Sequence, residues 1–187
     1  MSRSYVGTSP VRNEDRRLLT GQALFVDDVQ LPGMLHAAFV RSDHAHALIH
    51  GIDASAALAR DGVVAVITAA DLGDYWQPGP LLVPPPPIEG IVFNQASQVP
   101  LAKDRVRHVG EAIAMVVAVS RYVAEDAAAD VVVDLEPLDP VVDLEAALAD
   151  DAPVLHPQLG TNLAAHVVQR HGDYEAARAS ADLVLSR

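Results

Sequence analysis

The sequence of 187 residues contains no cysteine. This absence excludes disulfide bonds, thiol nucleophiles, iron–sulfur ligation and cysteine-based zinc sites. Any redox chemistry linked to this protein must therefore take place on another chain or on a bound cofactor. Lysine is almost absent as well, with Lys103 as its single occurrence, so arginine supplies nearly all of the positive charge.

Long apolar runs are also missing. No stretch approaches the roughly 20 residues needed to span a bilayer, and the first five residues lack the apolar stretch of a signal peptide. We therefore expect no membrane span and a cytoplasmic location. Positive charge is scarce, with a formal net charge of −12, and a surface this acidic repels phosphate backbones. We expect no binding to nucleic acid.

What is present divides into three parts. Residues 1–33 are rich in charged and turn-forming residues and show little periodicity, which predicts an extended arm. Regular patterns begin after Gly33 and predict a domain over residues 34–150. Residues 151–187 predict a turn-rich linker and the first elements of a following domain, because a strand pattern is still in progress at residues 181–185.

Short β-branched runs and capping residues predict the elements. Strands are expected at 35–40, 47–52, 63–67, 106–109, 113–119, 131–135, 163–168 and 181–185. Helices are expected at 54–60, 121–130 and 174–179, capped by Asp53, Ser120 and Asp173, with a short helix over 144–148. The succession of strand, helix and strand from 113 to 135 is typical of a βαβ unit and predicts an α+β fold, a mixed sheet with covering helices.

Prolines interrupt the domain between residues 72 and 100. Proline lacks an N–H donor and fixes φ, so this segment is expected to be a long loop. Long loops in compact domains tend to be functional or to contact partners. Its apolar side chains, Tyr75 and Trp76 among them, are candidates for docking on a neighbouring surface, and a poorly ordered surface excursion is the alternative.

One group of histidines is a candidate metal site. His44 and His46 would lie on the same face of an extended segment, close enough to share a metal ion. A third ligand would come from His50 or Asp43. The alternative, which we favour, is that these histidines form hydrogen bonds at a strand end or in an interface.

Glu111 follows a strand and precedes a very apolar one, and a glutamate there could act as a general base if it is partly buried. It could equally accept hydrogen bonds from backbone N–H groups or contact a partner, and no nucleophile is predicted near it. The acidic pairs Asp27–Asp28 and Glu14–Asp15 have the spacing of solvated turns, and a calcium-loop pattern is absent.

Many short segments, in one order along the chain, resemble the amino-terminal α/β hammerhead region of the large subunit of molybdenum hydroxylases, the family of xanthine dehydrogenases, aldehyde oxidases and carbon monoxide dehydrogenases. The resemblance covers nearly the whole chain apart from residues 73–99, and Asp43 departs from it, since proline is usual there. The matching segments are Arg12–Asp15, Leu18–Gly21, Phe25–Asp28, Leu31–Ala37, Val40–Ser42, His44–Ala47, Gly62–Val63, Asp71–Leu72, Leu101–Ala102, Val109–Glu111, Ala124–Ala128, Val133–Leu138, Asn162 and Gly172–Asp173.

The resemblance implies a hydroxylase complex. In that family the large subunit binds a molybdenum–pterin cofactor, a glutamate base assists hydroxylation of a carbon centre with water as oxygen source, and electrons pass through two [2Fe–2S] clusters to FAD. The pterin-binding loops and the catalytic glutamate lie beyond the hammerhead region. We therefore assign no catalytic, cofactor-binding or metal-ligating residue to this chain, and no substrate.

Three hypotheses follow. The first is a non-catalytic piece or split subunit of such a hydroxylase, with the remainder of the large subunit and the FAD and iron–sulfur subunits as partners, and residues 151–187 leading into a molybdopterin-binding domain. The second is a stand-alone interaction module that keeps the hammerhead fold without redox chemistry. The third is a small metalloenzyme that uses His44, His46 and His50.

Overall fold

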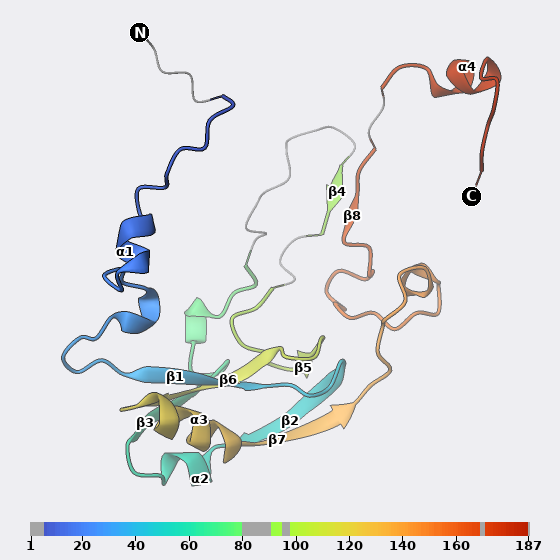
Figure 1. Cartoon of the computed structure of the whole chain (residues 1–187). Helices are drawn as coiled ribbons and strands as arrows, with labels where there is room; N and C mark the ends of the chain where they lie inside the picture. The colour runs from blue at the N-terminus through green and yellow to red at the C-terminus, as the bar shows by residue number, and fades with distance from the viewer. Residues whose placement is uncertain (1–5, 80–90, 95–97, 169–170, 187) are drawn as a thin grey trace. The chain divides into compact units, whose positions relative to one another are not determined.

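The computed structural model describes residues 6–79, 91–94, 98–168 and 171–186, and the chain divides into two compact units, Met1–Leu35 and His36–Arg187 (Figure 1).

The first unit contains a short helix, α1 (Asp15–Leu19), and a 3₁₀ turn, η1 (Val26–Asp28). The predicted extended arm therefore contains two short helical elements. The charges that suggested turns are placed to favour a helix instead, with Asp15 in its first turn and Arg16 and Arg17 in its last. The guanidinium of Arg12 also binds the Asp15 carboxylate at 2.9 Å.

The second unit is built around β6 (Ala112–Ala118), the central strand of a three-stranded antiparallel sheet. β1 (His36–Arg41) pairs with one edge of β6, and β3 (Val63–Thr68) pairs with the other. Ile113, Ala114, Val116 and Ala118 of β6 are buried. Because β6 has partners on both sides and small or β-branched residues at every position except Met115, it satisfies its backbone and packs at the same time.

A second three-stranded antiparallel sheet has the order β5 (Arg105–Val106), β2 (Ala47–Asp53), β7 (Val132–Pro137). A register shift between Ile49 and Gly51 marks a bulge in β2. A third ladder consists only of β4 (Val92–Phe93) and β8 (Ala165–His166).

Two helices cover the sheet centred on β6. α2 (Ser55–Leu58) packs against β3, and α3 (Arg121–Ala129) packs against β1 and β6 (Figure 1). The Ser120 hydroxyl accepts from the Val123 N–H at 3.3 Å and so caps α3 as predicted, while Asp53 accepts from the Ser55 N–H at 2.9 Å at the start of α2. The remaining short elements are η2 (Gly73–Tyr75), η3 (Ala146–Leu148) and α4 (Tyr174–Ala179).

Two buried clusters form the core. One contains Ala47, Ala102, Val106 and Ile113, and so joins the two large sheets. The other contains Ala57, Val116, Ala127 and Val131, and so joins the β6 sheet to the helices. Ile52 of β2 and Val133 of β7 pack against both clusters. These two side chains make the layers into one continuous core.

The α+β class is confirmed, but the strands are divided differently from the prediction. α3 leads from β6 into β7, and these two strands belong to different sheets, so no βαβ unit forms there. All the ladders among the described residues are antiparallel, where one mixed sheet was expected. Apolar periodicity identifies strands, but it does not determine which strands pair with one another.

Two further predictions need correction or restriction. The predicted strand at 181–185 is absent, because these residues have no strand partner among those described, and Leu183 and Leu185 remain exposed.

Much of the predicted proline loop lies outside the described residues. In the part that is described, the Trp76 indole donates to the Leu101 carbonyl at 2.8 Å and so docks on its own domain, whereas Tyr75 is 91% exposed.

Gly62, at the turn into β3, is a position that only glycine fits well. Its φ is +89°, and a Cβ there would lie 2.9 Å from Cγ2 of Val119.

We expect Gly62→Ala to lower the free energy of unfolding by about 1–2 kcal/mol, because the left-handed backbone and the collision with Val119 both disfavour alanine. Urea denaturation of the purified chain measures this. Gly51→Ala is the matched control, because no atom lies within 4 Å of its added Cβ. Equal losses of unfolding free energy in the two variants would contradict the requirement for glycine at position 62.

Candidate functional site

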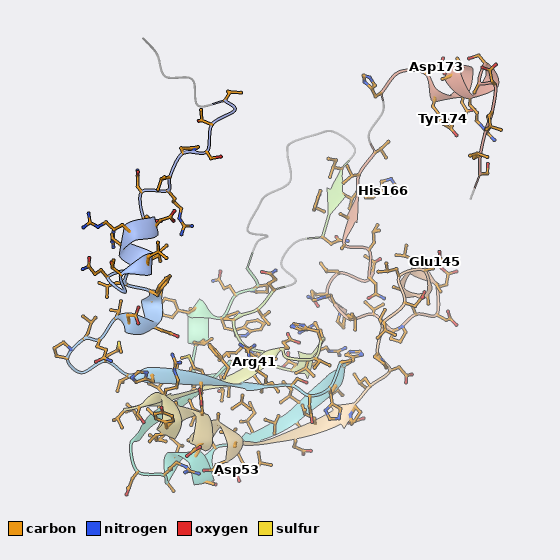
Figure 2. All side chains as sticks on the ribbon, in the orientation of Figure 1. Arg41, Asp53, Glu145, His166, Asp173 and Tyr174 are labelled. Atoms are coloured by element: carbon orange, nitrogen blue, oxygen red, sulfur yellow. The ribbon has the colours of Figure 1, made fainter. Side chains whose placement is uncertain are left out.

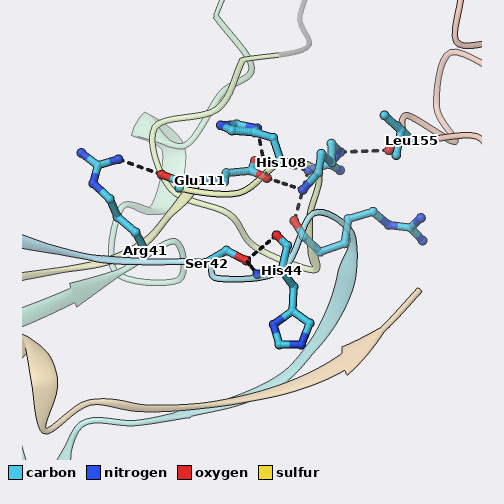
Figure 3. Close-up of polar contacts among 9 residues, drawn as sticks. Arg41, Ser42, His44, His108, Glu111 and Leu155 are labelled. Atoms are coloured by element: carbon cyan, nitrogen blue, oxygen red, sulfur yellow. Dashed lines mark hydrogen bonds and ion pairs between the residues drawn. The ribbon is translucent and has the colours of Figure 1, made fainter. Parts of the chain in front are cut away.

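A groove of about 490 Å³ lies where the turn between β5 and β6 meets the linker that follows β7. Its ionisable side chains come from separate parts of the chain. They are Arg41 at the end of β1, Arg107, His108 and Glu111 in the β5–β6 turn, and His156 in the linker. Figure 2 shows the side chains of the whole chain, and Figure 3 shows the polar contacts of this region.

The Glu111 side chain is the buried centre of the region, with an exposed fraction of 8%. Its Oε2 atom accepts a hydrogen bond from the Arg107 backbone N–H, and its Oε1 atom lies 3.8 Å from Nη1 of the Arg107 side chain. His108 Nδ1 is 3.8 Å from the same carboxylate. A buried carboxylate is costly unless donors surround it, and this turn supplies them. Of the roles considered for Glu111, that of a structural acceptor for backbone N–H groups is confirmed.

The backbone on either side of Glu111 is tied to the end of β1. The Ser42 N–H donates to the Glu111 carbonyl at 2.9 Å, and the Gly110 N–H donates to the Ser42 carbonyl at 2.7 Å. The Arg41 guanidinium donates from Nη1 to the Gly110 carbonyl at 2.8 Å (Figure 3). Gly110 has a φ of +84°, which the turn requires and which glycine adopts without strain. The turn is therefore held by both its backbone and its side chains.

Arg107 connects this turn to the linker. Its Nε donates to the Leu155 carbonyl at 3.0 Å, and its Nη1 donates to the Arg105 carbonyl at 3.3 Å (Figure 3). Asn162 closes the linker on itself: its Oδ1 accepts from the Leu155 N–H at 3.0 Å, and its Nδ2 donates to the Pro153 carbonyl at 2.8 Å. Leu155 is therefore fixed from both sides, which places the neighbouring His156 in the wall of the groove.

The groove is lined by two arginines and one carboxylate, so its formal charge is positive. Burial lowers the pKa of the Arg107 guanidinium, an effect that Glu111 opposes. Burial, and then the charge of Arg107, lower the pKa of His156, while Glu111 acts in the opposite direction. The arrangement favours a neutral His156 beside a charged Arg107, because the one carboxylate in the groove is already engaged.

The predicted histidine cluster does not converge. His44 Nδ1 lies 2.6 Å from Asp43 Oδ1, His46 Nδ1 lies 2.9 Å from the Asp139 carbonyl, and His50 Nε2 lies 2.6 Å from Glu136 Oε2. Residues 43–46 form a bend, so the extended geometry that would have put His44 and His46 on one face is absent. Within the described residues no three His, Asp or Glu side chains come together as metal ligands. The preferred alternative, hydrogen bonding at a strand end, describes these side chains.

The acidic pairs of the first unit form turn contacts. Asp28 accepts from the Phe25 N–H at 2.9 Å, and Asp15 binds Arg12. The sequence reasoning named Glu111 and quoted Arg41 within the segment Val40–Ser42, but gave Arg41 no role and missed Arg107 and His156. Nothing in the sequence shows that residue 156 returns to the turn at 107–111.

The fold and the groove define an α+β hammerhead-type domain without a metal centre among its described residues. Residues 20–139 match the family model of the aldehyde oxidase and xanthine dehydrogenase a/b hammerhead domain. The chain belongs to this family of molybdenum hydroxylases. The resemblance deduced from the sequence is thereby confirmed.

Three relatives illustrate the match. The chain is 43% identical to the carbon monoxide dehydrogenase large chain of Afipia carboxidovorans, over 90% of this chain and 20% of that protein. It is 39% identical to the nicotine 6-hydroxylase large subunit of Paenarthrobacter nicotinovorans, over 100% of this chain and 22% of that protein. The solved structure of reconstituted CO dehydrogenase from Oligotropha carboxidovorans superposes with a TM-score of 0.74 at 39% identity, covering 95% of this chain and 22% of that one. The chain thus spans about a fifth of the length of these relatives.

Removal of the buried carboxylate tests its structural role. Glu111→Ala leaves the Arg107 backbone N–H and the partly buried Arg107 guanidinium without their shared acceptor, so we expect the free energy of unfolding to fall by about 2–3 kcal/mol. Glu111→Gln keeps an acceptor oxygen and should lose about half as much. Thermal and urea unfolding measure both changes.

Glu125→Ala is the matched control for this pair of variants. Glu125 is exposed on α3, and its removal should change the free energy of unfolding by less than about 0.5 kcal/mol. A Glu111→Ala variant as stable as this control would show that the contact to Arg107 does not hold the turn.

Proposed function

We propose that this chain is a non-catalytic N-terminal part, or a split subunit, of a molybdenum–pterin-dependent hydroxylase or dehydrogenase that oxidises a carbon centre with water as oxygen source. One observation carries the proposal: the chain matches enzyme large subunits over nearly its whole length, yet covers only about a fifth of theirs. The remaining four fifths of such a subunit would hold the reaction centre, and this chain would take part in assembling it.

We propose that the cofactors of the reaction lie outside this chain. No three His, Asp or Glu side chains among them gather as metal ligands, and the buried Glu111 already accepts from Arg107. We therefore assign no step of the oxidation to this chain's residues. The molybdenum–pterin, [2Fe–2S] and FAD groups are proposed for the partner chains, namely the remainder of the large subunit and the iron–sulfur and flavin subunits.

The exposed apolar side chains fit a role within a larger assembly. In the first unit Leu19, Leu24 and Val26 are at least 75% exposed, and in the tail Leu183 and Leu185 are 74% and 86% exposed. An apolar surface that is this extensive on a small chain is typical of an interface. It supports the proposed division of the chain, with residues 1–33 as an arm, 34–150 as the hammerhead domain and 151–187 as the linker and beginning of a molybdopterin-binding domain.

The described residues contain no helix long and apolar enough to cross a membrane. A cytoplasmic location of the complex stays a prediction from the sequence.

Isolation of the native assembly tests the proposed function. The tagged full chain, recovered gently from its native host, should bring with it a molybdenum-containing chain together with iron–sulfur and flavin chains, identified by mass spectrometry and metal analysis. Recovery of the chain alone and free of metal would overturn the proposal and favour the stand-alone interaction module.

A dye-binding measurement tests the predicted interface. The isolated, folded chain should bind a hydrophobic fluorescent dye, and replacement of Leu183 and Leu185 by serine should reduce the fluorescence, because both side chains are mostly exposed. Tyr122→Ser on α3 is the control, since Tyr122 is equally exposed but lies outside the arm and the tail. A folded chain that binds no dye would contradict an unpaired interface there.

A further inference from the structure

We propose that the groove at the β5–β6 turn is a binding site for a carboxylate group, with the Arg41 guanidinium as its principal donor. This site is separate from the proposed function and does not depend on it. None of the relatives' names assigns such a site to this region. It rests on the shape of the groove, the sign of its charge and the state of its donors.

The charge of the groove is opposite to that of the chain. The protein carries a formal net charge of −12, yet this groove is lined by two arginines and two histidines against the single carboxylate of Glu111. That carboxylate is 8% exposed, and one of its oxygens accepts from the Arg107 backbone N–H. The Glu111 carboxylate is therefore occupied in stabilising the turn. The groove keeps an excess of positive charge that an anion from solution can reach.

The Arg41 guanidinium has N–H donors that make no hydrogen bond to the described residues. Among the described residues its guanidinium has one recorded hydrogen-bond partner, the Gly110 carbonyl, which it reaches through Nη1 at 2.8 Å. The guanidinium also lies over the Phe39 ring, with 5.2 Å from its carbon to the ring centroid. These two contacts hold the planar group in place while its remaining N–H donors stay unused. An arginine fixed in this way loses little conformational entropy when it binds a ligand.

Arg107 and His156 form the inner wall of the groove. Two backbone carbonyls, those of Leu155 and Arg105, orient the Arg107 guanidinium. Burial disfavours the charged form of both Arg107 and His156, so each side chain has a lowered pKa. A bound anion would favour the charged forms and reverse this effect. Anion binding and proton uptake by His156 should therefore be coupled.

The ligand class follows from the geometry of the donors. The guanidinium fork presents parallel N–H groups that match the two oxygens of a carboxylate. A groove of about 490 Å³ accommodates a short carboxylic acid or the side chain of one aspartate or glutamate from a polypeptide. The chemistry recognised is the same in both cases, and the experiment below separates the two sources.

The test uses the full chain and two carboxylate probes, glutarate and a short uncharged peptide that carries one glutamate. Glutaramide, which has the same carbon skeleton without charge, is the control ligand. Binding is followed by calorimetry at low ionic strength, because salt screens such contacts. The His156 ring resonances are followed by NMR against pH, with and without the probe.

Two substitutions locate the site. Arg41→Gln removes the charge and the fork and should weaken carboxylate binding about tenfold or more. Arg41→Lys keeps the charge without the fork and should give a smaller loss. Arg178→Gln on α4 changes the net charge equally, lies outside the groove and should leave the affinity unchanged.

The expected result is saturable binding of at least one carboxylate probe, no binding of glutaramide, and an upward shift of the His156 pKa when the probe is bound. Binding of glutarate alone would identify a free acid as the ligand class, and binding of the peptide alone would identify an acidic side chain of a partner. The proposal is overturned if neither carboxylate binds, or if Arg41→Gln binds as tightly as the unmodified chain.

Discussion

The contact between Glu111 and Arg107 is the constraint on which the β5–β6 turn and the adjoining linker depend. A carboxylate with 8% of its surface exposed needs donors close at hand, and here a backbone N–H and a guanidinium of the same turn provide them. Arg107, oriented in this way, then binds the Leu155 carbonyl and brings the linker to the sheet. One buried acid thus determines the path of the turn, the position of the linker and the walls of the groove.

The local elements could be predicted from the sequence, because their causes are local. Ser120 and Asp173 cap helices at the positions where a hydroxyl or carboxylate precedes a helical pattern, and their side chains accept from the N–H groups of Val123 and Ala176. The β-branched run at 113–119 is a strand because its residues fit a buried pleated surface. Family membership was also within reach, since many short segments occur in one order along the chain.

The pairing of the strands could not be predicted, because it depends on contacts between distant residues. β6 and β7 follow each other with α3 between them, a succession that is typical of neighbours in one sheet, yet they join different sheets. The groove was missed for the same reason, since the Arg107 to Leu155 contact spans 48 residues. The short helix within the arm was not predicted, because its charges were taken as signs of turns, although their order along residues 15–17 suits a short helix.

The strand order of the domain has a consequence for its synthesis. Among the described residues β1 pairs only with β6, and β2 pairs with β5 and β7, so neither strand finds a partner in the residues synthesised directly after it. β1 is complete at residue 41 and its partner at residue 118. At about 5–20 residues per second, roughly 4–15 s pass with apolar strand edges unpaired. In that interval the unpaired edges of these strands can pair with other chains, which is the hazard that edge strands carry.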